Sequence, residues 1–380
     1  MAKVSLLACS QYELGSLRAA LADSIRNLGG WEPYIRPGEK VLLKVNLVTN
    51  KDPDYAATTH PLFVQALAEL LMEYGARVSI GDSPGGLFNE EILRRLYQGT
   101  GMKRAAEASG ASLSYNTGFA EVKNPGGKLL KSLTQTAMVQ EADKVISVSK
   151  LKTHGMMTFT GAVKNQFGTV PGTKKAEYHF RMPQTQDFAD ALIDICLAAN
   201  PVLCFMDAVM AMEGNGPTGG IPRKVGAVLA SASPFGLDLV AAHLIGLKRE
   251  DVPTLHQAYL RGLGPEGVQK ADLVGENPQR FVLTDFKMPD HIKPQLMSGL
   301  GPVGRMLSGM LRPKVRFHTG ICVACQVCLR NCPAGAIVMK NQYPAVNYRQ
   351  CIRCYCCQEL CPRNAVTVQE SRIMKLANRL

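Results

Sequence analysis

Two matching cysteine runs near the C-terminus carry the most specific chemistry in this sequence of 380 residues. Each run has three cysteines separated by two residues, a fourth after three more residues, and a proline directly behind it. Spacings of two residues let a short loop wrap three corners of a cube, and such a run ligates a 4Fe-4S cluster. Because the run occurs twice, we expect two clusters. The runs consist of Cys322, Cys325, Cys328, Cys332 and Pro333, and of Cys351, Cys354, Cys357, Cys361 and Pro362.

Residues 314–369 closely resemble the bacterial two-cluster ferredoxins, in which the last cysteine of each run ligates the other cluster. The resemblance therefore implies two mixed sets of ligands. The segment departs from the pattern at Cys356, which lies between two ligands and is expected to be a packed or partly exposed thiol. The first cluster is expected on Cys322, Cys325, Cys328 and Cys361, and the second on Cys351, Cys354, Cys357 and Cys332.

Disulfide bonds and zinc are the alternative uses of such cysteines. Disulfides need an oxidising compartment, and only eight residues precede Cys9, too few for the charged and apolar regions of a signal peptide. Zinc sites pair two Cys-x2-Cys knuckles rather than two four-cysteine runs that end in proline.

Thiolates that ligate iron must stay reduced, so we expect a cytoplasmic protein. The sequence has no stretch of about 18 apolar residues, so no transmembrane segment is expected.

The positive charge of the chain is concentrated at its C-terminal end. The formal net charge is +12, and from residue 312 onward eleven Lys/Arg residues face only two acidic residues, Glu359 and Glu370. Oxidised clusters with their thiolates are anionic, so part of this basicity compensates the expected cofactor. The remainder predicts attraction to an acidic redox partner protein. With one Trp and no recognition motif, nucleic-acid binding is not expected.

Most of the chain before residue 286 alternates apolar strand patterns with helical patterns. This alternation predicts an α/β fold with a parallel or mixed sheet and helices on both faces. We expect an α/β domain over residues 1–285, a linker at 286–313, a small α+β two-cluster ferredoxin domain at 314–370 and a basic tail at 371–380. Strands are predicted at 3–9, 41–47, 77–81, 145–148, 202–206 and 225–230. Helices are predicted at 14–28, 61–74, 90–98, 102–109, 160–168, 186–198, 234–245 and 252–261.

Four blocks of the larger domain resemble, in their order along the chain, the domain-of-unknown-function family 362. The blocks read LLKVNL, GDSPGG, KLKTHGMMTFTGAVKNQFG and MDAVMAMEGNGPTGG, and the resemblance covers roughly residues 3–280. Members of that family are often fused to ferredoxin modules, which agrees with the cysteine runs. The resemblance implies no particular reaction, so any activity must be argued from the site.

Several residues of these blocks could bind an anion if the strand ends converge. Lysines near predicted ends of strands or helices supply positive charge, and glycine-rich loops allow a backbone to approach a ligand closely. We expect a pocket for a small anionic substrate or for an anionic cofactor such as a flavin. The alternative is that the glycines form turns and the lysines are solvated. These residues are Lys44, Lys150, Lys152 and Lys164, with Gly85, Gly86, Gly214, Gly216, Gly219 and Gly220.

Other polar residues of the same blocks complete the predicted site. His154 is a candidate general acid or base, with Lys150, Lys152 and Lys164 as catalytic cations. A hydrogen-bonded loop histidine and carboxylates that only cap helices or turns are the alternatives. The sequence has no Walker loop, dinucleotide-binding fingerprint or nucleophile elbow. The predicted cofactor-binding residues are Lys44, Asn46, Asp82, Gly85, Gly86, Asn165, Asp207, Glu213 and Asn215.

These observations favour an iron–sulfur redox protein that relays single electrons between a partner and an anionic substrate or cofactor held by the α/β domain. Whether it is a ferredoxin-linked oxidoreductase stays open. A non-enzymatic electron carrier or docking subunit is the main alternative, and a ligand-binding protein with structural clusters is a third. Two clusters in series favour electron transport, because structural support alone needs fewer metal centres. Convergence of the lysines on one pocket would support an enzyme, and their dispersal over separate faces would contradict it.

Overall fold

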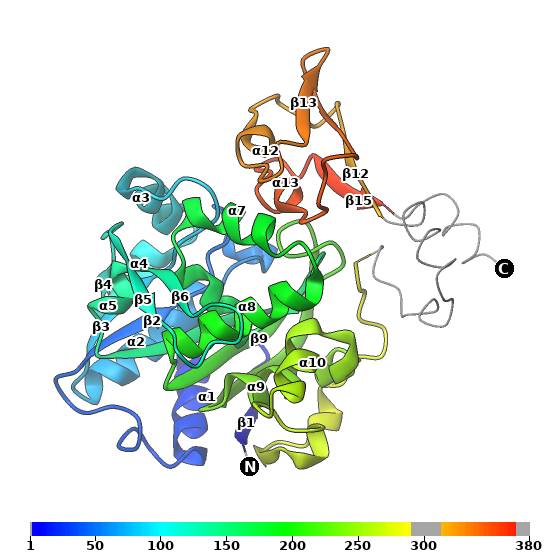
Figure 1. Cartoon of the computed structure of the whole chain (residues 1–380). Helices are drawn as coiled ribbons and strands as arrows, with labels where there is room; N and C mark the ends of the chain where they lie inside the picture. Colours follow the sequence, from blue (N-terminus) through cyan, green and yellow to red (C-terminus); the bar gives the residue numbers. More distant parts are fainter. Residues whose placement is uncertain (1, 290–312, 370–380) are drawn as a thin grey trace.

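The chain forms a large α/β domain and a smaller domain that contacts one end of it (Figure 1). This computed structural model describes residues 2–289 and 313–369. Most of the predicted linker at 286–313 and the basic tail at 371–380 lie outside the described residues. None of the helices in the described ranges has the length and apolar character needed to cross a membrane.

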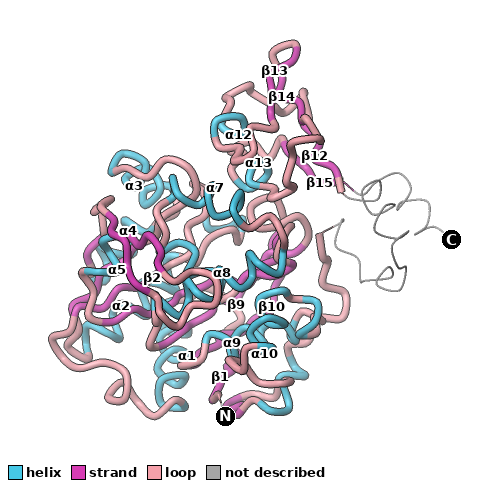
Figure 2. The backbone as a smooth tube through the Cα atoms, viewed as in Figure 1, coloured by secondary structure: helices cyan, strands magenta, loops and turns pink. Residues whose placement is uncertain are grey.

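A mixed β-sheet forms the centre of the large domain (Figure 2). Its order is β11-β1-β10-β9-β7-β2-β3-β4, and β8 pairs with β7 beside this path. The strands from β9 to β4 run parallel, whereas β10 is antiparallel to both β9 and β1. The strands are β1 (Lys3–Ala8), β2 (Lys40–Lys44), β3 (Arg77–Gly81), β4 (Ser112–Leu113), β7 (Lys144–His154), β8 (Thr158–Thr160), β9 (Leu203–Glu213), β10 (Ile221–Ser231) and β11 (Asp272–Gly275).

Helices cover both faces of the sheet, so the predicted fold class is confirmed. On one face, Leu17 and Phe63 pack with the strand residues Leu43 and Ile146. This layer contains α1 (Leu14–Asn27), α2 (Pro61–Glu73), α3 (Glu90–Gly99) and α4 (Met102–Ser109). The opposite layer contains α5 (Ala137–Gln140), α6 (Ala162–Asn165), α7 (Gly172–Arg181), α8 (Thr185–Ala199), α9 (Pro234–Leu244) and α10 (Pro253–Leu260).

Short elements complete the large domain. A hairpin of β5 (Phe119–Lys123) and β6 (Ser132–Thr136) packs beside α8, with Leu133 in the same apolar cluster as Phe188. The single-turn helices are η1 (Pro53–Tyr55), η2 (Gln166–Thr169), η3 (Arg249–Asp251), η4 (Val268–Lys270) and η5 (Pro278–Arg280).

The small domain has two antiparallel strand pairs and two short helices. In sequence order these are β12 (Lys314–Phe317), α12 (Val327–Arg330), β13 (Ile337–Lys340), β14 (Tyr343–Val346), α13 (Cys356–Glu359) and β15 (Val366–Gln369). The first strand pairs with the last, and β13 pairs with β14. Val315, Tyr355 and Val366 form its apolar core, and Met156 of the large domain packs against that core. The small domain is therefore joined to the large one by apolar contact.

Polar contacts also hold the two domains together. Lys51 Nζ donates to Asn364 Oδ1 at 2.8 Å. Thr218 Oγ1 donates to the Glu359 carbonyl oxygen at 3.2 Å. The contacts come from loops at the end of the sheet where the parallel strands terminate, which is where ligand sites of α/β domains form.

Three strands are longer than predicted, among them β10, which starts at Ile221, and β2 ends at Lys44, before its predicted end at residue 47. The sequence pattern predicts that β7 ends near residue 148 and β9 near residue 206, but β7 reaches His154 and β9 reaches Glu213. The antiparallel partners β8 and β10 supply backbone hydrogen-bond partners beyond the parallel part of the sheet. The predicted helix at 160–168 is divided between α6 and η2, and α7 was not predicted.

A buried carboxylate in α9 fixes the start of α6. Asp238 is 1% exposed and accepts hydrogen bonds from the backbone N–H groups of Ala162 and Val163 at 2.6 and 3.0 Å. This interaction orients the segment that carries Lys164 and Asn165. Burial raises the pKa of Asp238 to about 7, although the two N–H groups act in the opposite direction.

We expect Asp238→Asn to change how stability depends on pH. Because the folded-state pKa is raised, the contribution of Asp238 is fully present below its unfolded pKa and is lost as pH rises through about 7. The difference in thermal midpoint between wild type and Asp238→Asn should therefore shrink from about pH 5 to about pH 8. Thermal unfolding followed by circular dichroism at several pH values checks this. A difference in thermal midpoint that grows with pH would contradict the raised pKa of Asp238.

Candidate functional site

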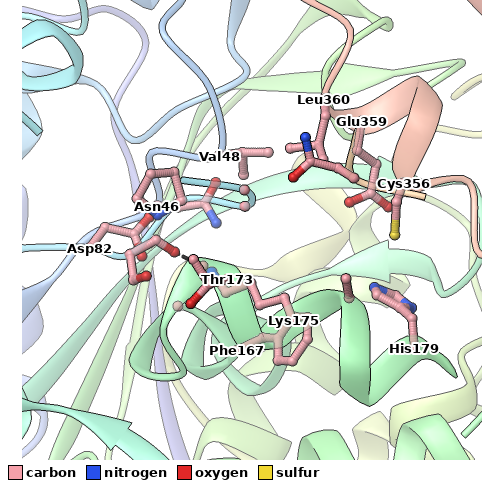
Figure 3. Close-up of a pocket in the computed structure, with 18 of the residues that line it drawn as sticks. Asn46, Val48, Asp82, Phe167, Thr173, Lys175, His179, Cys356, Glu359 and Leu360 are labelled. Atoms are coloured by element: carbon pink, nitrogen blue, oxygen red, sulfur yellow. Dashed lines mark hydrogen bonds between the residues drawn. The ribbon is translucent and has the colours of Figure 1, made fainter. Parts of the chain in front are cut away.

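A pocket of about 100 Å³ lies between the two domains (Figure 3). Asn46 and Asp82 approach it from the loops after β2 and β3, while Cys356, Glu359 and Leu360 approach it from α13 of the small domain. The remaining lining is Val48, Ser83, Pro84, Gly85, Gly86, Lys164, Asn165, Phe167, Gly168, Gly172, Thr173, Lys175, Ala176, His179 and Asn331. Neither domain alone encloses this space.

The floor of the pocket is a buried ion pair at the end of β2. Lys44 Nζ lies 2.8 Å from Asp82 Oδ1 and also donates to Asn165 Oδ1 at 3.2 Å. Burial lowers the pKa of Lys44, and Asp82 partly offsets this effect. Gly168 lies against the pair so closely that a Cβ atom there would be 2.0 Å from Asp82 Oδ1. The lack of a side chain at Gly168 is therefore a steric requirement of this ion pair.

Two further lysines face the cavity beside an aromatic ring. The ammonium groups of Lys164 and Lys175 lie 5.9 and 5.5 Å from the centre of the Phe167 ring. Lys175 Nζ also donates to the Ser83 carbonyl oxygen. Burial lowers the pKa of Lys175 to about 7, and burial lowers the pKa of Lys164 against the attraction of Glu359. Both residues line the cavity, and the charge of Lys175 is sensitive to pH near neutrality.

Polar atoms without partners also line the pocket. His179 is 4% exposed and stacks on Phe188 with ring centres 4.3 Å apart, but its Nδ1 has no hydrogen-bond partner among the described residues. The buried hydroxyl of Ser83 likewise has none within the described ranges. Gly172 and Thr173 place the N-terminal turn of α7 at the same cavity, and the N–H groups of a helix N-terminus attract anions. Buried polar groups normally have partners, so these atoms favour a bound polar ligand.

Glu359 of the small domain connects this pocket to the large domain. His154 Nδ1 accepts from the N–H groups of Met156 and Met157 at 3.0 and 3.2 Å, so the ring carries its proton on Nε2. Nε2 lies 2.9 Å from Glu359 Oε1, at ion-pair distance but outside hydrogen-bond alignment.

His154 and Glu359 have different charge states in this contact. Burial lowers the pKa of His154 to about 4, and the cation of Lys164 adds to this effect. Burial acts to raise the pKa of Glu359, but the charge of His154 in its protonated form and the cation of Lys164 outweigh it and bring that pKa to about 2. At neutral pH the contact is therefore a neutral imidazole facing a carboxylate.

The other predicted lysines are satisfied inside the large domain. Lys150 Nζ lies 2.9 Å from Asp207 Oδ2 and 2.6 Å from the Tyr12 hydroxyl. Lys152 Nζ donates to Asn46 Oδ1 and to the Ala57 carbonyl oxygen, both at 2.6 Å. Among the described residues, Lys152 has no carboxylate at ion-pair distance, and burial lowers its pKa well below the ordinary value. Lys152 therefore acts on the pocket only through Asn46.

Five of the nine predicted cofactor-binding residues reach the pocket. Asn46, Asp82, Gly85, Gly86 and Asn165 line it, whereas Lys44 lies beneath Asp82. The others have roles elsewhere: Asp207 pairs with Lys150, Glu213 accepts from the N–H of Lys287 at 3.1 Å, and the Asn215 carbonyl accepts from Gln358 at 3.3 Å.

Two of the predicted glycines, Gly85 and Gly86, contact the small domain, whereas Gly214, Gly216, Gly219 and Gly220 do not line the pocket. A Cβ atom on Gly85 would be 2.9 Å from Leu360 Cδ2, and one on Gly86 would be 3.1 Å from Asn331 Oδ1. Gly86 also has a positive φ of 88°, which favours glycine. The glycine-rich loop after β3 therefore lets Asn331 and Leu360 of the small domain approach closely.

The cysteines of the small domain gather around two cavities of about 20 Å³ each. Backbone N–H groups point at the sulfurs at their edges, from Ala336 to Cys332 at 3.3 Å and from Ala365 to Cys361 at 3.2 Å. Two sets of four thiols with amide donors fit two iron–sulfur cubes. One cavity is lined by Cys322, Cys325, Cys328 and Cys361, and the other by Cys332, Cys351, Cys354, Cys357 and Cys356.

Cys356 belongs to both the second cysteine cavity and the pocket between the domains. It is 8% exposed, so the thiol is packed. Lys175, His179, Ser83, Cys356 and Glu359 are pocket residues that the sequence interpretation did not assign. For Glu359 a signal existed, because it is the single acidic residue between residues 313 and 369.

Comparison with known proteins identifies both parts of the chain. The sequence profile of the family described as "Domain of unknown function (DUF362)" matches residues 41–243, and that of the "4Fe-4S dicluster domain" matches residues 314–362. The chain is 34% identical over 297 residues to the Thylakoid-associated protein sll1697 of Synechocystis sp., covering 77% of this chain and 89% of that protein. The lactate racemase apoprotein from Thermoanaerobacterium thermosaccharolyticum has a TM-score of 0.37 and 10% identity, over 60% of this chain and 54% of that one.

We expect Gly168→Ala to destabilise the protein, because the added methyl group must displace Asp82 or Lys44. Overpacking of this kind costs about 1–3 kcal/mol. Gly126→Ala is the matched control, since a Cβ atom there meets nothing within 4 Å. Thermal unfolding of both variants measures the effect. Equal midpoints for the two variants would show that the pocket floor adapts without cost.

Proposed function

This chain belongs to the DUF362 family, and we propose that it is an iron–sulfur redox protein that delivers single electrons to a small anionic ligand in the pocket between its domains. The observation that carries the proposal is the position of Cys356, which lines both the second cysteine cavity and the pocket. A cluster held in that cavity would be separated from the ligand by little more than one side chain. Single-electron chemistry is what such clusters supply.

We assign the cysteines that line one cavity as the ligands of one cluster, and those that line the other cavity, apart from Cys356, as the ligands of the second. The first set is Cys322, Cys325, Cys328 and Cys361, and the second is Cys332, Cys351, Cys354 and Cys357. Cys356 is left as a packed thiol. The need to keep these thiolates reduced supports a cytoplasmic location, which stays a prediction.

The charges around the pocket support an anionic ligand. Asp82 is matched by Lys44, and Lys164 offsets the carboxylate of Glu359, which leaves Lys175 as an additional cation. The N-terminal turn of α7 and the unpaired atoms of Ser83 and His179 add hydrogen-bonding capacity. Sites for drug-sized ligands have volumes of roughly 300–1,000 Å³. The smaller cavity found here favours a small carboxylate or phosphate over a flavin.

His154 and Glu359 are suited to orient the groups that surround the ligand. Because Nε2 carries the proton, His154 cannot accept one there until its proton is lost. The ionised Glu359 carboxylate lines the pocket, where it attracts Lys164 and can accept a hydrogen bond from a ligand. We therefore assign His154 a positioning role, and Lys164 and Lys175 the binding of the anion.

Lys164→Ala and Lys175→Ala should each weaken binding of small anions. Loss of one hydrogen bond to a charged group costs about 1.5–3 kcal/mol, or roughly ten-fold or more in affinity. Isothermal titration with phosphate and with a panel of small carboxylates measures this in the intact, cluster-loaded protein.

Lys174→Ala provides the matched control. Its side chain is on the same helix but lies 3.4 Å from Glu177 and does not line the pocket. Unchanged affinity in this control, with loss in the two test variants, supports the site. If Lys164→Ala and Lys175→Ala bind every anion as the wild type does, the pocket is not an anion site, and a non-enzymatic electron carrier becomes the better interpretation.

Anion affinity should also fall as pH rises through about 7. Lys175 is cationic below its lowered pKa of about 7 and neutral above it, so the ligand loses a charged partner at higher pH. Lys175→Arg keeps the charge at all these pH values and should flatten the profile. Affinities measured by titration between about pH 6 and about pH 9 test this. A flat profile in the wild type would argue that Lys175 does not contact the ligand.

A further inference from the structure

The face of the small domain around the first cysteine cavity has an apolar centre and a basic rim. Ile321 and Val323 are 49% and 59% exposed, although both are large apolar residues. Val323, the exposed Cys325 and Arg363 all line the first cysteine cavity. Arg330 Nη2 donates to the Cys325 carbonyl oxygen at 2.8 Å, which places a second guanidinium at the same loop. We call Ile321, Val323, Arg330 and Arg363 the first-cluster face.

We propose that the first-cluster face is the docking surface for a small acidic electron-carrier protein. This proposal shares only the clusters with the proposed function and does not depend on an anion in the pocket. The partner must bring its redox centre close to the first cluster, and the exposed side of Cys325 is where the chain leaves that cavity accessible.

Charge complementarity argues for an acidic partner. Residues 313–369 contain seven Lys/Arg residues and one acidic residue. That acid, Glu359, faces His154 and has a side chain only 15% exposed. The exposed charges of the described small domain are therefore all positive, including Lys314, Arg316, Arg330, Lys340, Arg349 and Arg363. A surface of one sign steers a partner of opposite sign and fixes its orientation.

The arrangement of the two cysteine cavities would connect the docking surface to the pocket. The second cavity borders the pocket through Cys356, whereas the first carries the exposed Cys325. Docking here lets one electron leave the reduced cofactor of the carrier while the first cluster gains it, and no bond forms or breaks. An anionic membrane would also attract this surface, but its apolar centre consists of two side chains on a loop and not of an amphipathic helix.

Binding and electron transfer from an acidic flavodoxin test the proposal on the cluster-loaded, full-length protein. Arg330→Glu/Arg363→Glu should weaken the affinity, measured by titration, and slow the second-order reduction of the clusters by at least about ten-fold at low ionic strength. Both differences should shrink at about 0.5 M salt, where screening shortens the reach of charge. Arg363→Glu alone leaves the Arg330–Cys325 bond in place and should show a smaller loss in the same direction.

Arg104→Glu/Lys270→Glu is the matched control, because it makes the same change in net charge at exposed positions of the large domain. Photoreduction by a small deazaflavin shows that the clusters of every variant are intact. Unchanged affinity and rate in Arg330→Glu/Arg363→Glu would overturn the proposal. The proposal would also be overturned if Arg330→Glu/Arg363→Glu lost binding to phosphatidylglycerol vesicles but still bound flavodoxin as the wild type does. That result would assign the first-cluster face to a membrane. Wild-type protein that docks flavodoxin but binds none of the small anions would refute only the proposed function.

Discussion

The buried contact between Glu359 and the large domain is the constraint on which the rest of this structure depends. Glu359 lies between Cys357 and Cys361, which belong to different cysteine cavities, and its carboxylate faces His154. A carboxylate taken out of water needs compensation from nearby charges or hydrogen-bond donors. The cation of Lys164 attracts the carboxylate, and the protonated nitrogen of the neutral His154 ring faces it. The loop that carries Cys357 and Cys361 thereby lies against the end of β7, and the pocket is lined from both sides of this contact.

The sequence determined the small domain far better than the large one. Cysteine spacing is a direct geometric requirement of the cluster, so the positions of Cys322 and Cys351 predict a local structure without knowledge of the fold. Strand ends in the large domain depend on remote partners. The extension of β7 to His154 requires β8 to pair with it, and hydrophobic periodicity does not reveal that pairing.

The same dependence explains which site residues were found. Asn46, Asp82 and Asn165 follow strands or fall in polar blocks, and topology brings such residues together. Lys150 and Lys152 looked equally suitable, but a lysine inside an extended strand is buried and pairs locally, as Asp207 and Ala57 show. Lys175 was not predicted because α7 was not, and a lysine on a surface helix has no sequence signal that distinguishes it from a solvated one.

The segment from Cys356 to Leu360 serves two domains at once. It belongs to the cluster-binding loop, and it also forms the wall of the pocket opposite Asp82. The two halves of this protein are therefore not interchangeable cassettes. A generic ferredoxin joined to the same α/β domain would bring equivalent metal centres but would leave the pocket open to water. Evolution by recombination of these two domains would therefore have to transfer residues 356–360 together with the metal-binding motif.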